Sequence, residues 1–427
     1  MTSIIDKPPA PRTQHLYYLD NLRVAMVLLV VIHHAAQAYG PADWWYVTGD
    51  QHAPVLATLS AVGGAFRMSL LFFVAAFLVP RAADHKGSWG FVRGRLTRLG
   101  IPFLVGSATI IPVLMYVYYR EYRSYPPISF PRYYLDVFLG FGARPGDWTG
   151  PIWPDLQFGH LWFIQHLLAF SALYVLFHWL GGLLRRVRPT MTLARPATIL
   201  ARPATILAQR ATILARPATM PVRLTRMTGN RSLVIVTLTL AAVVFLVRIW
   251  YPLDQWVPLF GFIQAEPARL PQYTAFFTAG VIAYRRDWLA RLPRSTGYTW
   301  LAIGAALTAV LFWTGSDTRF FAPGGASWAS ACWALTETFL CVGLSLGLLA
   351  LFRDAFAGHN RLTRVVAASS YPIYIIHLPI VVALQFAFAH AGLPTLATFV
   401  AVATFGMAIS VVTAVTIRRL PGLRTIL

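Results

Sequence analysis

The sequence predicts an all-α polytopic membrane protein with about ten transmembrane helices and with both termini in the cytoplasm. Hydrophobic residues make up 57% of the 427 residues, the mean hydropathy is +0.58, and only 12% of the residues are charged. This charged fraction is about half of that in an average soluble domain. Runs of about 20 apolar residues, which suffice to cross a bilayer core, recur along the chain.

Ten apolar runs are the candidates for these helices. Irregular backbone that faces lipid would leave its polar groups unsatisfied, so each crossing is expected to be a helix. The sixth and seventh runs are the shortest. The runs cover residues 19–38, 60–80, 100–119, 160–180, 232–250, 271–284, 299–314, 328–352, 363–388 and 394–416.

The charge distribution predicts how these spans are oriented. The chain carries 36 Lys and Arg residues against 15 Asp and Glu residues. Most of the basic residues fall in segments that are cytoplasmic if the N-terminus is inside, as expected for cytoplasmic loops. Much of the net charge of +21 therefore has a topological explanation, and no nucleic-acid partner is expected.

The domain organisation follows from the same pattern. Within the transmembrane domain, 181–231 is predicted to be a basic cytoplasmic loop near anionic lipid. Its seven-residue repeat, ARPATIL, has a proline in most copies, which argues against a coiled coil. The N-terminal tail, the transmembrane domain and the C-terminal tail are residues 1–18, 19–417 and 418–427.

The two cysteines, Cys332 and Cys341, predict no metal centre. They form no CxxC motif and show no Cys/His ligand spacing, so neither a zinc site nor a disulfide framework is expected. Among the basic residues only Lys7 and Lys86 are lysine, which indicates a GC-rich genome and hence a bacterial source.

Ionisable side chains in the first span are the leading functional candidates, because each costs at least about 2.5 kcal/mol on insertion scales. Arg23 and His34 are eleven residues apart. On a helix they lie within about 20° of one face and about 16 Å apart along the axis, so both are expected to face one groove. His33 points about 100° away and is expected to be a packed or hydrogen-bonded histidine. An alternative for Arg23 is a snorkelling anchor paired with Asp20.

Arginines elsewhere suggest two further roles. Arg67 lies about a third of the way into the second span, where a charge requires a partner or a wet cavity. Arg93, Arg95 and Arg98 lie at the cytoplasmic mouth of the third span, where three guanidinium groups could hold phosphates. Ordinary cytoplasmic anchoring is the alternative for these three. The aromatic-rich outer segment 120–158 is suited to stacking on sugars or to anchoring at the interface.

Four motifs in chain order resemble the membrane acyltransferase family 3. They are YYLDNLRVAMVLLVVIHHA at 17–35, with its Arg, ten intervening residues and His; FVRGRLTRLGIP at 91–102; GHLWFIQHLL at 159–168; and SSYPIYIIHLP at 369–379. The doubled YYLDNLR and HH look closest to the glucan biosynthesis protein C branch. The second span departs from the pattern, since FFVAAF at 72–77 stands where relatives tend to have FFxxSGF.

The resemblance implies transfer of an acetyl or succinyl group from cytoplasmic acyl-CoA to a hydroxyl of an envelope glycan or lipid-linked saccharide, at the bacterial cytoplasmic membrane. His34 would be the general base, Arg67 an oxyanion stabiliser and Arg23 a residue on the pantetheine path. Arg93, Arg95 and Arg98 would hold the phosphates of the donor. His160, Trp162, Tyr371 and His377 would contact substrate or support the site. A secondary transporter or flippase that uses the same intramembrane groups is the alternative function.

Overall fold

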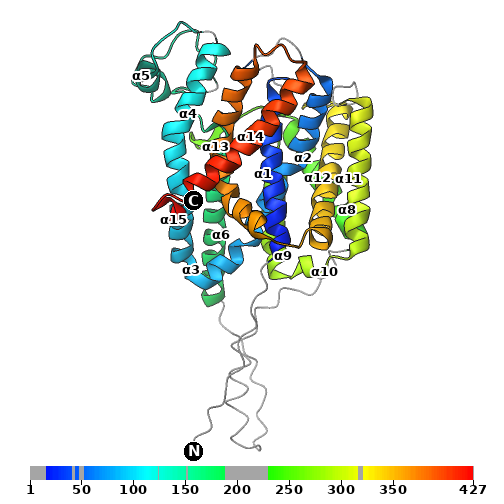
Figure 1. The fold of residues 1–427 in the computed structure, drawn as a ribbon. Coiled ribbons are helices and arrows are strands. Elements are labelled where there is room, and N and C mark those ends of the chain that lie inside the picture. Colours follow the sequence, from blue (N-terminus) through cyan, green and yellow to red (C-terminus); the bar gives the residue numbers. More distant parts are fainter. Residues whose placement is uncertain are drawn as a thin grey trace, which may run out of the picture.

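A computed structural model describes most of the chain as a bundle of long helices (Figure 1). The described residues are 16–40, 44–47, 52–123, 125–150, 152–187, 229–315 and 321–426. The repeat at 194–220, and most of the predicted basic loop 181–231 that contains it, lie outside these residues.

The first half of the described chain supplies α1 to α6. α3, η1 and α4 follow one another without a loop, and η1 is one of two short π-helical segments. The elements are α1 (Tyr17–Gln37), α2 (Pro54–Phe77), α3 (Val79–Arg95), η1 (Leu96–Gly100), α4 (Ile101–Glu121), α5 (Phe130–Arg132), η2 (Tyr133–Phe138), η3 (Gly159–Leu161) and α6 (Trp162–Val187).

The second half of the described chain adds a short antiparallel hairpin and eight further helices. In the hairpin, Val257 pairs with Ala265 and Leu259 with Ile263. The elements are α8 (Asn230–Arg248), β1 (Val257–Leu259), β2 (Ile263–Ala265), α9 (Leu270–Arg285), α10 (Trp288–Arg291), α11 (Arg294–Thr314), α12 (Trp328–Ala355), α13 (Arg361–Phe388), α14 (Thr395–Ile417) and α15 (Leu423–Ile426).

Nine helices in the described part of the chain are long and apolar enough to cross a membrane. The all-α polytopic membrane fold is therefore confirmed, and the protein is a multi-pass membrane protein. The predicted span 271–284 forms α9, which has only 16 residues. A helix of that length is about 24 Å long and falls short of a bilayer core of about 30 Å.

Charge separates along the long axis of the bundle. α3, which carries Arg81, Arg93 and Arg95, lies on the same side of the molecule as α10, at the lower end in Figure 1. α5, in the aromatic-rich outer segment, lies at the opposite end. This arrangement matches a cytoplasmic lower side and an outer upper side.

Local sequence explains where two of the long helices begin. At the start of α13, the Asn360 side chain accepts a hydrogen bond from the Thr363 N–H at 2.8 Å, and the Thr363 hydroxyl accepts from the Asn360 N–H at 2.9 Å. This reciprocal capping box satisfies two backbone donors. At the start of α12, the Ser327 side chain accepts from the Ser330 N–H at 3.2 Å.

Small residues allow α11 and α12 to pack closely. A Cβ atom on Gly343 would lie 2.8 Å from the Trp300 carbonyl oxygen, and one on Gly347 would lie 2.5 Å from Leu301 Cβ. Glycines four residues apart let helix backbones approach in membranes, where packing rather than hydrophobic burial drives association. α1 lies inside the bundle, in contact with α2, α12, α13 and α14.

Candidate active site

The candidate active site is a cavity of about 800 Å³ between α1, α2, α9, α12 and α13, with walls from the β-hairpin and the outer segment. This volume lies within the range of pockets that bind small molecules and cofactors. The polar and aromatic side chains that line it include His33, His34, Gln37, Trp45, Arg67, Tyr118, Arg123, His160, Trp162, Glu266, Arg269, Tyr273 and Tyr374.

His34 reaches this cavity from the middle of the bundle. Its Nδ1 lies 2.8 Å from Nε2 of His377 on α13, and its ring stacks on Trp45 with centroids 5.8 Å apart. Gln385 fixes this arrangement: it accepts from the Trp45 indole at 2.8 Å and donates to the His34 carbonyl oxygen at 3.1 Å. The His34 imidazole is therefore held by protein side chains on one side, and its other side faces the cavity. It does not face lipid.

His160 is held against α13 because of a proline. Pro379 has no N–H to donate to the Ile375 carbonyl one turn earlier. His160 Nε2 donates to that free carbonyl at 2.8 Å, and the Tyr374 hydroxyl donates to the His160 carbonyl. Gly159, just before it, has a φ of +46°, a left-handed conformation that favours glycine.

His33 lines the same cavity as His34, and this corrects the expectation that it faces elsewhere. It is also hydrogen-bonded, as predicted, because the Gln37 amide approaches its Nε2 at 3.1 Å. Both histidines can line one cavity although they point in different directions, because the cavity extends around α1 toward α2.

Arg23 and His34 face the same neighbouring helix, as their spacing predicts. Arg23 donates to the Ser370 hydroxyl and to the Ala367 carbonyl of α13, each at 3.0 Å. It also pairs with Asp20 at 3.0 Å, as the snorkelling alternative anticipated. Arg23 does not line the cavity, so the two residues share a face of α1 without sharing the cavity.

Arg67 is a buried cation that lines the cavity. Its relative exposure is 5%, and its Nε has no hydrogen-bond partner in the described structure. No carboxylate among the described residues forms an ion pair with it, whereas the neighbouring Arg269 is paired with Glu266 at 3.1 Å. The cavity that was expected around Arg67 is present.

A buried ion network forms the wall behind Arg67. Glu337 on α12 pairs with Arg248 from α8 and with Arg269 at the start of α9. Arg269 also donates to the Gly64 carbonyl of α2 at 3.3 Å. Arg248 and Glu337 are 0% and 2% exposed, so the network joins four helices through a buried charge pair, while Arg269 borders the cavity.

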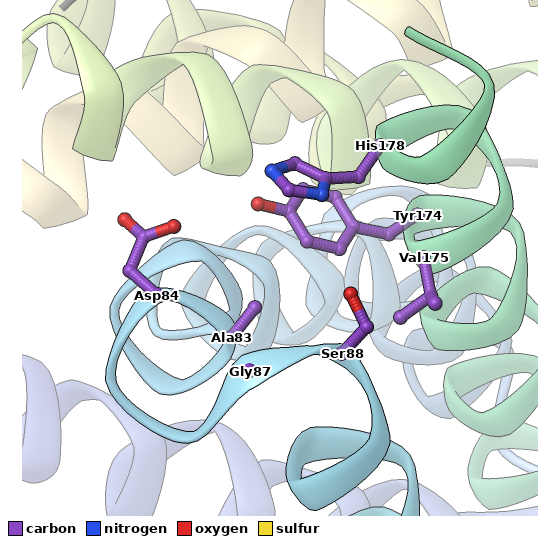
Figure 2. Close-up of a pocket in the computed structure, with 7 residues that line it drawn as sticks. All are labelled: Ala83, Asp84, Gly87, Ser88, Tyr174, Val175 and His178. Atoms are coloured by element: carbon purple, nitrogen blue, oxygen red, sulfur yellow. The ribbon is translucent and has the colours of Figure 1, made fainter. Parts of the chain in front are cut away.

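The basic motif lies away from the cavity. Arg93 and Arg98 are exposed, and Arg95 lies over the Phe91 ring at 5.2 Å. A second cavity of about 300 Å³ lies between α3 and α6 (Figure 2), where Asp84 is paired with Arg285. Because Asp84 already neutralises Arg285, that arginine is not available to hold phosphate groups at this cavity.

The outer segment contributes Arg123, Ile152 and Gln157 to the wall of the cavity. Arg123 lies 4.4 Å from the Trp148 ring centroid and 3.6 Å from Asp155, which also accepts from the Tyr133 hydroxyl at 2.9 Å. Burial raises the pKa of the Asp155 carboxyl above its usual range, and Arg123 opposes that rise. These contacts hold Arg123 in place at the cavity wall.

A comparison with protein families decides the identity of this arrangement. The model of the acyltransferase domain of acyltransferase family 3 matches residues 16–418, nearly the whole chain. The chain belongs to acyltransferase family 3. The transporter or flippase alternative is therefore set aside in favour of an enzyme. No curated protein and no solved structure matches the chain.

The other motif residues of this family 3 acyltransferase take different places. Trp162 lines the cavity and stacks on Tyr273 with centroids 5.4 Å apart. Tyr371 and His377 do not line it, although both lie on α13 beside residues that do. The Tyr371 hydroxyl has no hydrogen-bond partner in the described structure.

Several cavity residues of this acyltransferase were missed from the sequence. Trp45, Tyr273 and Tyr374 look like ordinary membrane aromatics, and Arg269 looks like a charge at a helix end. Their positions arise from contacts between segments far apart in the chain, which no local pattern records. The sequence contained one signal for this region, namely the two prolines on either side of Tyr374. A proline inside a helix has no N–H, so it leaves a carbonyl group one turn earlier without its usual hydrogen bond.

Proposed function

We propose that this enzyme transfers an acyl group from cytoplasmic acyl-CoA to a hydroxyl of a glycan or glycolipid on the outer side, with His34 as general base. The observation that carries the proposal is the position of His34. It lies in a cavity deep in the bundle, its Nδ1 is engaged by His377, and no group among the described residues bonds its Nε2.

The reaction follows from that position. His34 Nε2 takes the proton of the acceptor hydroxyl as the oxygen attacks the thioester carbon. The resulting tetrahedral intermediate expels the CoA thiolate, which receives the proton from the imidazolium. The products are an O-ester and free CoA. General-base catalysis of this kind is worth about 10²- to 10⁴-fold, and it requires no protein nucleophile.

Arg67 is suited to stabilising the oxyanion of that intermediate. It is the cavity-lining arginine for which the described residues provide no carboxylate partner, so its charge is available to a bound group. Charge that is already fixed in a site shielded from water stabilises a developing oxyanion more strongly than solvent does. Arg269 cannot serve equally well, because Glu266 and Glu337 already neutralise it.

The donor is proposed to enter from the basic lower side. Arg93, Arg95 and Arg98 would hold its phosphates, and their exposure leaves two of the three guanidinium groups free to do so. Arg23 keeps 32% of its side chain exposed while it bonds α13, so it would contact the pantetheine arm on the way to His34. The membrane is proposed to be the bacterial cytoplasmic membrane.

The acceptor is proposed to enter from the outer side. There the cavity wall is rich in aromatic rings, including Trp44, Trp45, Tyr118 and Trp256. The faces of Trp and Tyr rings can stack on the apolar C–H faces of a saccharide, and their N–H and O–H groups can bond its hydroxyl groups. Acetyl and succinyl groups both fit this scheme as the transferred group, and O-acetylation of an envelope glycan or a lipid-linked saccharide is its simplest form.

Sealed inside-out membrane vesicles test this proposal, because their cytoplasmic face is outward and their glycan is inside. Labelled acetyl-CoA or succinyl-CoA is added outside, and label in the lumenal glycan is then measured before and after mild base. We expect base-labile label only in vesicles that contain the enzyme. Right-side-out vesicles should give none. Label that enters the lumen without forming an ester would contradict the proposal.

A further inference from the structure

The geometry points to His377 as a positioning residue that holds His34 in the tautomer with its lone pair on Nε2. This inference rests on the proposed role of His34 as general base. It concerns a side chain that lies outside the cavity and is 0% exposed, so His377 acts through His34 and not on the substrate.

The proton positions on His377 follow from its backbone contact. Its Nδ1 lies 2.7 Å from the Tyr374 carbonyl oxygen. A carbonyl oxygen only accepts hydrogen bonds, so this Nδ1 carries a hydrogen. In a neutral imidazole the other nitrogen, Nε2, then carries a lone pair and accepts.

Burial keeps the His377 ring neutral. The ring is surrounded by His34, His160 and Tyr374, and no carboxylate contacts it among the described residues. A charged imidazolium without an anion beside it is costly at such a site. Therefore only one of its two nitrogens carries a hydrogen.

The same reasoning fixes the tautomer of His34. Nε2 of His377 accepts, and it lies 2.8 Å from His34 Nδ1. Two lone pairs at that distance would repel, so His34 Nδ1 carries the hydrogen and donates it. The lone pair of neutral His34 is then on Nε2, the nitrogen that has no partner among the described residues and that the proposed base reaction needs.

Neighbouring side chains hold the imidazole rings of His34 and His377 in position next to each other. His377 is anchored on the segment of α13 to which His160 bonds through Ile375 and Tyr374. On the other side of His34, the Trp45 ring lies almost parallel, at 14°. During attack the His34 imidazolium would still donate to His377, whose acceptor nitrogen stabilises the new charge.

Two substitutions of His377 separate positioning from mere packing. His377→Leu removes the acceptor, whereas His377→Gln keeps an acceptor oxygen near the position of Nε2. We expect the Leu variant to lose about 10²-fold in kcat, because a base in the wrong tautomer is nearly inactive, while KM for the acyl donor changes less than about twofold. The Gln variant should recover most of kcat. Ser369→Ala is the matched control, since Ser369 is buried on α13 and, among the described residues, bonds only its own helix.

Nitrogen-15 NMR of histidine-labelled protein reads the tautomer without any substrate. The His34 signals are those missing from the His34→Gln variant. We expect a protonated Nδ1 and a bare Nε2 in the wild type and in His377→Gln, and a predominantly Nε2-protonated ring in His377→Leu. A protonated Nε2 in the wild type, or full kcat in His377→Leu, would overturn the inference. If the wild-type enzyme showed no acyl transfer, the proposed function would be refuted. The NMR measurement of the His34 tautomer needs no substrate, so it would still test the inference about His377.

Discussion

Replacing His34 with glutamine is expected to lower kcat for acyl transfer by about 10²- to 10⁴-fold, the usual contribution of a general base. Glutamine is similar in size and keeps a hydrogen-bonding group near His377, but it cannot accept a proton. Donor binding should change little, because no contact that we assign to the donor involves this side chain. The measurement is steady-state transfer of labelled acyl groups by purified enzyme in lipid.

His390→Gln is the control for this substitution. His390 is exposed beyond the end of α13, so the same chemical change there should leave kcat unchanged. If kcat of the His34 variant fell less than about threefold, another group would have to be the base. The remaining histidines of the cavity, His33 and His160, would then be tested in the same way.

The second large effect is expected on stability, from Glu337→Gln. This change leaves the guanidinium of Arg248, which is 0% exposed, without its carboxylate. Breaking one side of a buried ion pair typically costs about 3–5 kcal/mol. The free energy of unfolding should fall by that amount, as measured by denaturant titration in detergent micelles.

Two further variants test the cause of that loss. Glu121→Gln removes an exposed carboxylate and should change stability by less than about 0.5 kcal/mol. Adding Arg248→Met to Glu337→Gln removes the orphaned charge, so part of the lost stability should return. An unfolding midpoint of Glu337→Gln equal to that of the wild type would show that the ion network does not stabilise the fold.

The fold could largely be predicted from the sequence because lipid imposes a simple rule on it. Long apolar runs become helices, and arginine-rich segments gather on one side, so nine of the ten predicted spans coincide with helices able to cross a membrane. The exception, 271–284, was apolar but short. Its helix α9 packs along α2, where Gly280 lies directly against the Phe73 carbonyl group.

The site was predictable only where it depends on one helix. The spacing of Arg23 and His34 predicted that both face one groove; both contact α13, but only His34 lines the cavity, so the shared groove was wrong. Their partners Ser370 and His377 lie more than 300 residues away in the chain, and helix periodicity says nothing about such pairs. For the same reason, the ion pairs of Glu337 and the cavity position of His33 could be found only in three dimensions.

Chemical rescue of His34→Ala tests the central claim most directly, namely that an imidazole in this cavity accepts the proton of the attacking hydroxyl. The alanine leaves room for free imidazole in a cavity of about 800 Å³. We predict that added imidazole restores label transfer to this variant in a saturable manner and has no effect on the wild type. A folded variant that binds acyl-CoA normally but stays inactive at saturating imidazole, or that is fully active without it, would contradict the account.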